Sequence, residues 1–127
     1  MTSFILNVTF DCATPVNVAR FWAEVTGWPL RQHDDTPGHE EYSVSPPAWD
    51  PETLSGGPRL YFVQVPEPKQ LKNRLHLDIF PDDVSQADEL ARLVRLGATV
   101  VGGQPGDAGW IVMADPEGNE FCLESDE

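Results

Sequence analysis

The sequence predicts an α+β fold made of two tandem βαβββ modules, whose mixed sheets curve around a shared cleft. Three observations predict this fold. A β-rich run is followed at once by a capped amphipathic helix, and three more strand-like runs come after that helix. The same order recurs after Pro66-Glu67-Pro68. Two copies of one supersecondary unit within 127 residues indicate a duplicated fold.

The first module opens with a β-rich run from Phe4 to Cys12. Thr14 is the predicted N-cap of the helix that follows, because Pro15 suits the first helical position. Gly27 is predicted to end this helix in the left-handed conformation. Apolar residues recur along the helix at i, i+3, i+4 and i+7, namely Val18, Phe21, Trp22 and Val25. This spacing predicts an apolar stripe that packs on a sheet. The other strands of the module are predicted at 28–32, 41–45 and 59–65.

The second module repeats this order. A strand is predicted from Arg74 to Phe80, and Asp82 or Asp83 is predicted to cap a helix over Val84–Leu96. Gly97 is predicted to end that helix. Three further strands are predicted at 99–102, 110–114 and 120–124, separated by turns rich in Gly, Pro and Asp.

The repeat has a register that can be checked. Asn7 and His76 are 69 positions apart. The same shift carries the apolar stripe of the first helix onto Ala87, Leu90, Ala91 and Val94. We therefore expect a single domain, 1–127, made of module 1 (about 1–66) and module 2 (about 74–127). The alternative is that any two βα units match this well because they share capping signals.

The charge balance limits the function classes. The chain has 8 Lys and Arg against 21 Asp and Glu, a formal net charge of −13. Such a surface repels nucleic acids and anionic membranes, so a neutral or cationic small molecule is the expected partner. No window reaches the roughly 20 apolar residues of a membrane span, and the N-terminus lacks signal-peptide features, so a cytoplasmic location is expected. Cys12 and Cys122 have no CxxC spacing and are expected to be buried free thiols.

Three segments carry a family resemblance. Residues 7–14 followed by 19–28 resemble the opening of glyoxalase-like proteins, with a strand and then a helix bearing a Phe-Trp pair. Asp115 to Leu123 is similar to their terminal Asp-Pro-Asp/Glu-Gly-Asn turn and last strand. Val65 to Asp78 resembles the start of the second half in the actinobacterial-type glyoxalase-like subfamily. The chain therefore resembles the glyoxalase/bleomycin resistance protein/dioxygenase superfamily, also called vicinal oxygen chelate, over nearly its whole length. This superfamily includes isomerases, dioxygenases, thiol transferases and drug-sequestering proteins, so its motifs predict fold better than reaction.

The resemblance implies a divalent metal (Zn, Fe, Mn or Ni) held by residues on the first and last strands of each half. Carried over by motif, the implied ligand positions are Asn7, Gln64, His76 and Cys122. Of these, His76 is the one standard ligand, because amide oxygens are weak donors for transition metals. The missing carboxylates disfavour glyoxalase I and extradiol dioxygenase activity.

Nearby carboxylates offer a substitute, since Glu120 and Glu124 share a strand face with Cys122, and Asp78 shares one with His76. The competing interpretations are that His76 is a hydrogen-bonding residue of the cleft and that Cys122 is a small core residue. His33 and His39 flank a Pro-Gly turn and are expected in solvent.

A binding function is the other interpretation. Large aromatic residues are numerous, and an aromatic cleft in an acidic protein suits a flat or cationic small molecule. The expected ligand-binding residues are His76, Trp49, Trp110, Tyr42 and Asn7. Lys69, Lys72 and Arg74 form a basic cluster that either holds an anionic group or is a solvated linker.

The sequence thus favours a glyoxalase-like protein that binds a small molecule, in the manner of bleomycin-resistance-like sequestration. The alternative is a metal-dependent lyase, isomerase or dioxygenase with a non-standard site around His76. A structural or interaction module is the third hypothesis. The resemblance also implies a homodimer.

Overall fold

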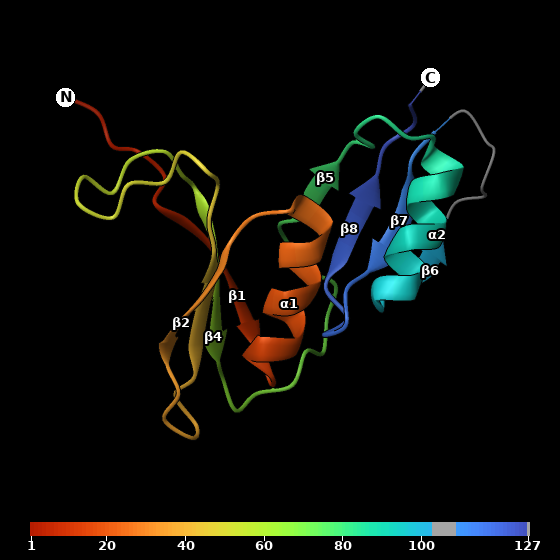
Figure 1. Cartoon of the computed structure of the whole chain (residues 1–127). Helices are drawn as coiled ribbons and strands as arrows, with labels where there is room; N and C mark the ends of the chain where they lie inside the picture. The colour runs from red at the N-terminus through yellow and green to blue at the C-terminus, as the bar shows by residue number, and fades with distance from the viewer. Residues whose placement is uncertain (103–108, 127) are drawn as a thin grey trace. The chain divides into compact units, whose positions relative to one another are not determined.

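The computed structural model describes residues 1–102 and 109–126. It consists of two compact units, Met1–Pro68 (unit 1) and Lys69–Glu127 (unit 2). Each unit contains a four-stranded mixed sheet and one helix (Figure 1). The predicted α+β class with two βαβββ modules is confirmed. The boundary between the units lies in the interval left between the two predicted modules.

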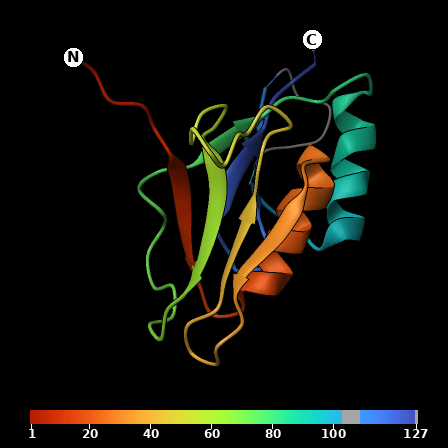
Figure 2. The same cartoon turned by 60° about the vertical axis from the view of Figure 1, so that its left-hand side comes forward.

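Unit 1 follows the predicted order of elements. Its elements are β1 (Asn7–Cys12), α1 (Pro15–Thr26), β2 (Leu30–Asp34), β3 (Glu41–Val44) and β4 (Arg59–Gln64). The sheet order is β1-β4-β3-β2, with β1 parallel to β4 and the other neighbours antiparallel (Figure 2). The predicted first strand was too long at its start, because Phe4 and Ile5 lie outside the sheet and are 66% and 70% exposed.

The core of unit 1 lies between α1 and one face of its sheet. Val18, Phe21 and Trp22 of the predicted stripe are buried, and the face that they cover carries Leu60 and Phe62. Gly27 ends the helix at φ +72°, as expected for a residue without a side chain. The other face of the sheet is not covered by α1, and its side chains are mostly polar.

Unit 2 has the same topology. Its elements are β5 (Leu77–Ile79), α2 (Gln86–Leu96), β6 (Thr99–Gly102), β7 (Ile111–Ala114) and β8 (Glu120–Leu123). The sheet order is β5-β8-β7-β6, with β5 parallel to β8. The turn predicted between β6 and β7 lies largely outside the described residues. In the described part of the chain, no helix combines the length and the apolar character needed to span a membrane.

The predicted caps of the second helix were wrong. Ser85 is the N-cap, and its hydroxyl oxygen accepts from the backbone N–H of Asp88 at 3.1 Å. Asp83 instead has a φ of +61°, and the helix begins at Gln86 rather than Val84. A serine whose side chain accepts from the backbone N–H three residues later is a standard N-cap. Serine and aspartate are about equally favoured as N-caps, so the residue type does not distinguish Ser85 from the aspartates.

The positions onto which the 69-residue shift carries the α1 stripe are not the buried positions of α2. The buried residues are Gln86, Glu89 and Leu93, whereas Val94 is 48% exposed. These three positions lie 68 residues after Val18, Phe21 and Val25 of α1, one less than the 69 residues between Asn7 and His76. The side-chain amide of Gln86 donates to the carbonyl of Leu123 at 3.3 Å, which holds this polar residue on the buried side.

The Asp-Pro-Glu-Gly-Asn turn before β8 is stabilised by one carboxylate. Asp115 is buried, and its Oδ1 accepts from the backbone N–H groups of Glu117 at 2.9 Å and Asn119 at 3.0 Å. Gly118 takes φ +85° in the same turn. This motif is therefore structural, since it fixes where β8 begins.

Candidate functional site

The chemistry of unit 2 gathers on the sheet face that α2 does not cover. Successive side chains of a strand alternate between faces, so Glu120 and Cys122 share one face of β8 while Phe121 and Leu123 are buried on the other. Glu124 follows directly after β8 and lines the same cavity as Cys122. Asp78 of β5 pairs with Cys122 in the parallel ladder. The register thus brings a carboxylate beside the thiol.

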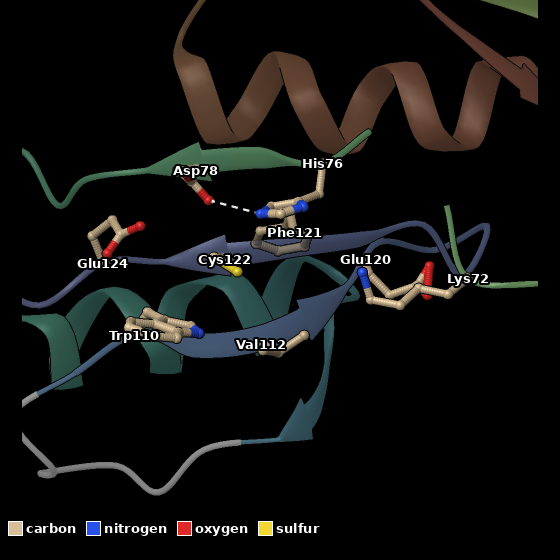
Figure 3. Close-up of a pocket in the computed structure, with 9 residues that line it drawn as sticks. All are labelled: Lys72, His76, Asp78, Trp110, Val112, Glu120, Phe121, Cys122 and Glu124. Carbon is tan, nitrogen blue, oxygen red and sulfur yellow. Dashed lines mark ion pairs between the residues drawn. The ribbon is translucent and has the colours of Figure 1, made fainter. Parts of the chain in front are cut away.

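Three potential metal ligands meet at this point. His76, just before β5, places Nε2 at 3.3 Å from Oδ1 of Asp78. One ligand atom from each of His76, Asp78 and Cys122 lies within 4.8 Å of the others. Figure 3 shows His76 and Asp78 projecting from the β5 segment toward the Cys122 sulfur on β8. The three residues form what we call the His-Asp-Cys cluster.

A cavity of about 380 Å³ lies over this face of unit 2. Its lining residues are Lys72, His76, Asp78, Trp110, Val112, Glu120, Phe121, Cys122 and Glu124. The indole of Trp110 is 61% exposed and stands at the start of β7, beside the cluster (Figure 3). The cavity therefore combines an aromatic ring, an imidazole, a thiol and an excess of carboxylates.

Two groups that line the cavity, the Cys122 thiol and the Glu120 carboxyl, have pKa values shifted in opposite directions. Burial raises the pKa of the Cys122 thiol, and the carboxylates of Asp78 and Glu124 raise it further. Burial alone would raise the pKa of Glu120, but a hydrogen bond from Lys69 and bonds with the backbone outweigh it, so the pKa is lowered. The thiol is therefore neutral at pH 7 in the metal-free protein, and Glu120 is ionised.

Glu120 lines the cavity and also contacts Lys69 and Asn73 in the segment before β5. Lys69 Nζ lies 2.9 Å from its Oε1, and the backbone N–H of Glu120 donates to Oδ1 of Asn73 at 2.9 Å. Asn73 in turn donates to the carbonyl of Glu120 at 3.1 Å. These contacts tie the segment before β5 to the start of β8, so Lys69 is not simply a solvated linker residue.

The residues of unit 1 that the motif pointed to are not on one face. Asn7 pairs with Arg59 at one end of the β1–β4 ladder and Cys12 pairs with Gln64 at the other. Because Arg59 and Gln64 are five residues apart on one strand, Asn7 and Gln64 lie on opposite faces of the sheet. The Gln64 amide oxygen accepts from the backbone N–H of Glu40 at 3.2 Å.

Tyr42 and Trp49 also occupy different places. Tyr42 is buried on the side of the sheet that packs on α1, and its hydroxyl accepts from the side chain of Gln32 at 3.0 Å. Trp49 lies in the loop between β3 and β4, where the guanidinium carbon of Arg59 stands 4.3 Å from the centre of its ring. Within unit 1, Trp49 and Asn7 are thus joined through Arg59.

The register of the two ladders identifies a position that sequence reasoning missed. Asp78 pairs with Cys122, and the residue 69 positions before Asp78, Thr9, pairs with Tyr61. Tyr61 is therefore the unit 1 counterpart of Cys122, rather than Gln64. Its hydroxyl donates to Oε1 of Glu41 at 2.6 Å. The ladder partner of Thr9 identifies Tyr61, whereas choosing a residue by its suitability as a metal ligand led to Gln64.

The model of the glyoxalase-like domain family matches residues 7–124, so the chain belongs to this family. A comparison with curated protein sequences gives no match.

Solved structures share this fold at low sequence identity. A fosfomycin resistance protein, FosX, from Listeria monocytogenes has a TM-score of 0.69 at 14% identity, covering 100% of this chain and 95% of that one. The trypanothione-dependent glyoxalase I of Leishmania major has a TM-score of 0.63 at 12% identity, covering 98% and 88%. TnmS3, an antibiotic binding protein from Streptomyces sp. CB03234, has a TM-score of 0.58 at 22% identity, covering 97% and 95%.

Proposed function

We propose that this glyoxalase-like protein binds a flat, cationic or neutral small molecule in the cavity on the open face of unit 2. The observation that carries the proposal is the cavity of about 380 Å³ with the exposed Trp110 indole on its wall. Pockets of this size hold drug-sized ligands when an aromatic surface is combined with a few polar groups. Sequestration without chemistry is the mode of action that we favour, and TnmS3, which shares the fold, is an antibiotic binding protein.

The charged residues that line the cavity favour one class of ligand. Asp78, Glu120 and Glu124 face the cavity against one cation, Lys72. A cation over the face of an indole gains about 0.5–2 kcal/mol, and the carboxylates add an attraction that depends on ionic strength. An anionic ligand would meet an excess of negative charge. We therefore expect planar organic cations to bind more tightly than anions of the same size.

The binding test uses proflavine, a planar aromatic cation, followed by fluorescence anisotropy in buffer with EDTA. We expect saturable one-to-one binding, weakened about tenfold in Trp110→Ala. Trp28→Ala, which removes an indole from unit 1 instead, is the matched control and should leave the affinity unchanged. Equal affinity in Trp110→Ala and the wild type, or no saturation up to millimolar dye, would contradict the proposal.

The second candidate function is a metal-dependent lyase, isomerase or dioxygenase, favoured by the His-Asp-Cys cluster. A neutral imidazole, a carboxylate and a thiolate fit Zn²⁺ better than Mn²⁺, because sulfur is a poor ligand for harder ions. FosX of Listeria monocytogenes was solved with Mn(II), so a metal-bound state has a precedent in this fold. When bound, the ion would act as a Lewis acid toward a ligand oxygen.

The metal candidate is tested by elemental analysis of untagged protein purified without chelator. About one equivalent of Zn, Fe, Mn or Ni, lost in both His76→Ala and Cys122→Ser, would favour it. His39→Ala removes a loop histidine and is the control that should keep the metal. Less than a tenth of an equivalent, with no uptake from added Zn²⁺, would exclude this candidate and leave the binding function. The motif-derived ligands Asn7 and Gln64 would be tested in the same series.

The homodimer and the cytoplasmic location stay predictions. A single-chain mass by light scattering at micromolar concentration would contradict the dimer.

A further inference from the structure

Arg59 is held in unit 1 by contacts that fix the plane of its guanidinium. Its carbon Cζ lies 4.3 Å from the centre of the Trp49 ring and 5.1 Å from that of Tyr61. Its Nε donates to Oδ1 of Asn7 at 2.8 Å. Two aromatic contacts and a hydrogen bond at Nε restrict the rotation that a surface arginine normally keeps.

The loop between β3 and β4 is shaped to bring Trp49 to this position. A Cβ on Gly57 would lie 3.2 Å from the carbonyl oxygen of Leu6 and 3.4 Å from Cζ3 of Trp49. A Cβ on Gly56 would lie 2.0 Å from the carbonyl oxygen of Ala48. The two glycines therefore let the loop close against the β1–β4 end of the sheet with the indole over the guanidinium.

The remaining donors of Arg59 lie at the outer end of the guanidinium. Because Nε donates to Asn7, the N–H groups of Nη1 and Nη2 remain as the pair of donors at the end of the side chain. Among the described residues, no carboxylate forms an ion pair with Arg59 within 4.0 Å. Asp11 and Glu41 both pair with Val63, four residues along β4, which is a backbone separation of about 13 Å from Arg59. Glu41 also accepts from the Tyr61 hydroxyl.

Charges of both signs act on the side chains around Arg59. Burial lowers the pKa of His33, and the charges of Arg59 and Arg31 lower it further, against an opposing effect of Glu41. The imidazole is hydrogen bonded to the hydroxyl of Ser43 at 2.7 Å, and its ring lies 5.3 Å from that of Tyr61. Two of the eight basic residues thus act on one face of the unit 1 sheet.

We infer that Arg59, fixed by Trp49 and Asn7, is a binding site for a small oxyanion, the carboxylate or phosphate group of an organic ligand. Guanidinium presents two parallel N–H groups that match the two oxygens of such a group. The site lies in unit 1 and uses none of the residues of the unit 2 cavity, so it stands independently of the proposed function.

The test titrates ¹⁵N-labelled protein with benzoate and with phenyl phosphate, followed by the arginine Nε–H signals. We expect the Arg59 signal to shift with saturation for at least one anion, and the comparison of the two identifies which oxyanion is preferred. Arg59→Lys keeps the charge but loses the planar pair, and should weaken binding at least fivefold. Trp49→Leu, which frees the guanidinium, should weaken it as well.

Arg20→Lys on α1 is the matched control and should bind like the wild type, as should His76→Ala in unit 2. Thermal melting of each variant checks that it is folded. No saturable shift up to about 20 mM of either anion, or equal affinity in folded Arg59→Lys and Arg20→Lys, would overturn the inference. Such a result would assign Arg59 a purely structural role in holding the loop, and it would leave the proflavine test of unit 2 unaffected.

Discussion

The loop that carries Trp49 depends on Gly56 for two separable reasons. Gly56 has φ +85°, and a Cβ there would meet the backbone carbonyl of Ala48 at 2.0 Å. Gly38 has the same φ of +85°, yet a Cβ there would have no atom within 4 Å. Substituting alanine at each position therefore separates the conformational cost from the steric cost.

The magnitudes follow from these contacts. A left-handed conformation costs an alanine about 1–2 kcal/mol, and this applies to both variants. In Gly56→Ala the carbonyl must also move by more than about 1 Å to reach ordinary contact distance. That movement disrupts the turn in which the N–H of Asp50 donates to Ser55 O at 2.9 Å and the N–H of Leu54 donates to Asp50 O at 2.7 Å. Two lost backbone hydrogen bonds add about 2 kcal/mol.

Urea unfolding followed by circular dichroism measures the difference. We expect Gly38→Ala to lower the free energy of unfolding by about 1–2 kcal/mol and Gly56→Ala by about 3–4 kcal/mol, with Tm about 8 °C lower than in the control variant. Equal destabilisation of the two variants would refute the reasoning, because it would mean that the contact with Ala48 is relieved without cost.

Three further predictions concern titration and packing. Lys69→Met should lower stability by about 0.5 kcal/mol at neutral pH. The folded pKa of Glu120 is depressed, so the loss should be full above its ordinary pKa of 4.5, fade as pH falls through the lower folded value, and show in Tm against pH. Burial and the hydrogen bond to Glu41 raise the pKa of Tyr61 to about 12. In a titration followed by ultraviolet absorbance, Tyr61 should therefore ionise at higher pH than an ordinary tyrosine, and at lower pH in Glu41→Gln than in the wild type. Phe62→Ala should cost about 3–5 kcal/mol in urea unfolding, because Phe62 is fully buried under α1.

The fold could be predicted largely because its signals are local. The Pro15 start and the Gly27 end of α1 are backbone properties of those residues, and the stripe between them reports which face is buried. The α2 face could not be predicted from the repeat, since a one-residue slip places Gln86 where an apolar residue was expected. Its amide is held there by the carbonyls of Gly109 and Leu123, which no periodicity reveals.

The site was harder because it depends on pairing between distant strands. His76 and Trp110 were named from sequence and line the cavity, and Asp78 was considered as an alternative carboxylate. Arg59 was not singled out at all, because its aromatic and amide partners come from a loop and another strand. Only the ladder register shows that such residues share a face.

The duplicated topology explains why the two open faces carry unlike chemistry. Arg59 lies two residues before Tyr61 on β4, and Glu120 lies two residues before Cys122, the counterpart of Tyr61, on β8, so Arg59 and Glu120 occupy equivalent positions. Side chains on the helix side are constrained in size and polarity, since each packs against its own helix. Those on the opposite face carry no such packing requirement within their unit, so a cation at one position and an anion at its counterpart are both compatible with the same backbone. A ligand class inferred from the net charge of the whole chain therefore does not decide what binds at Arg59, whose guanidinium is held by an aromatic ring and a neutral amide.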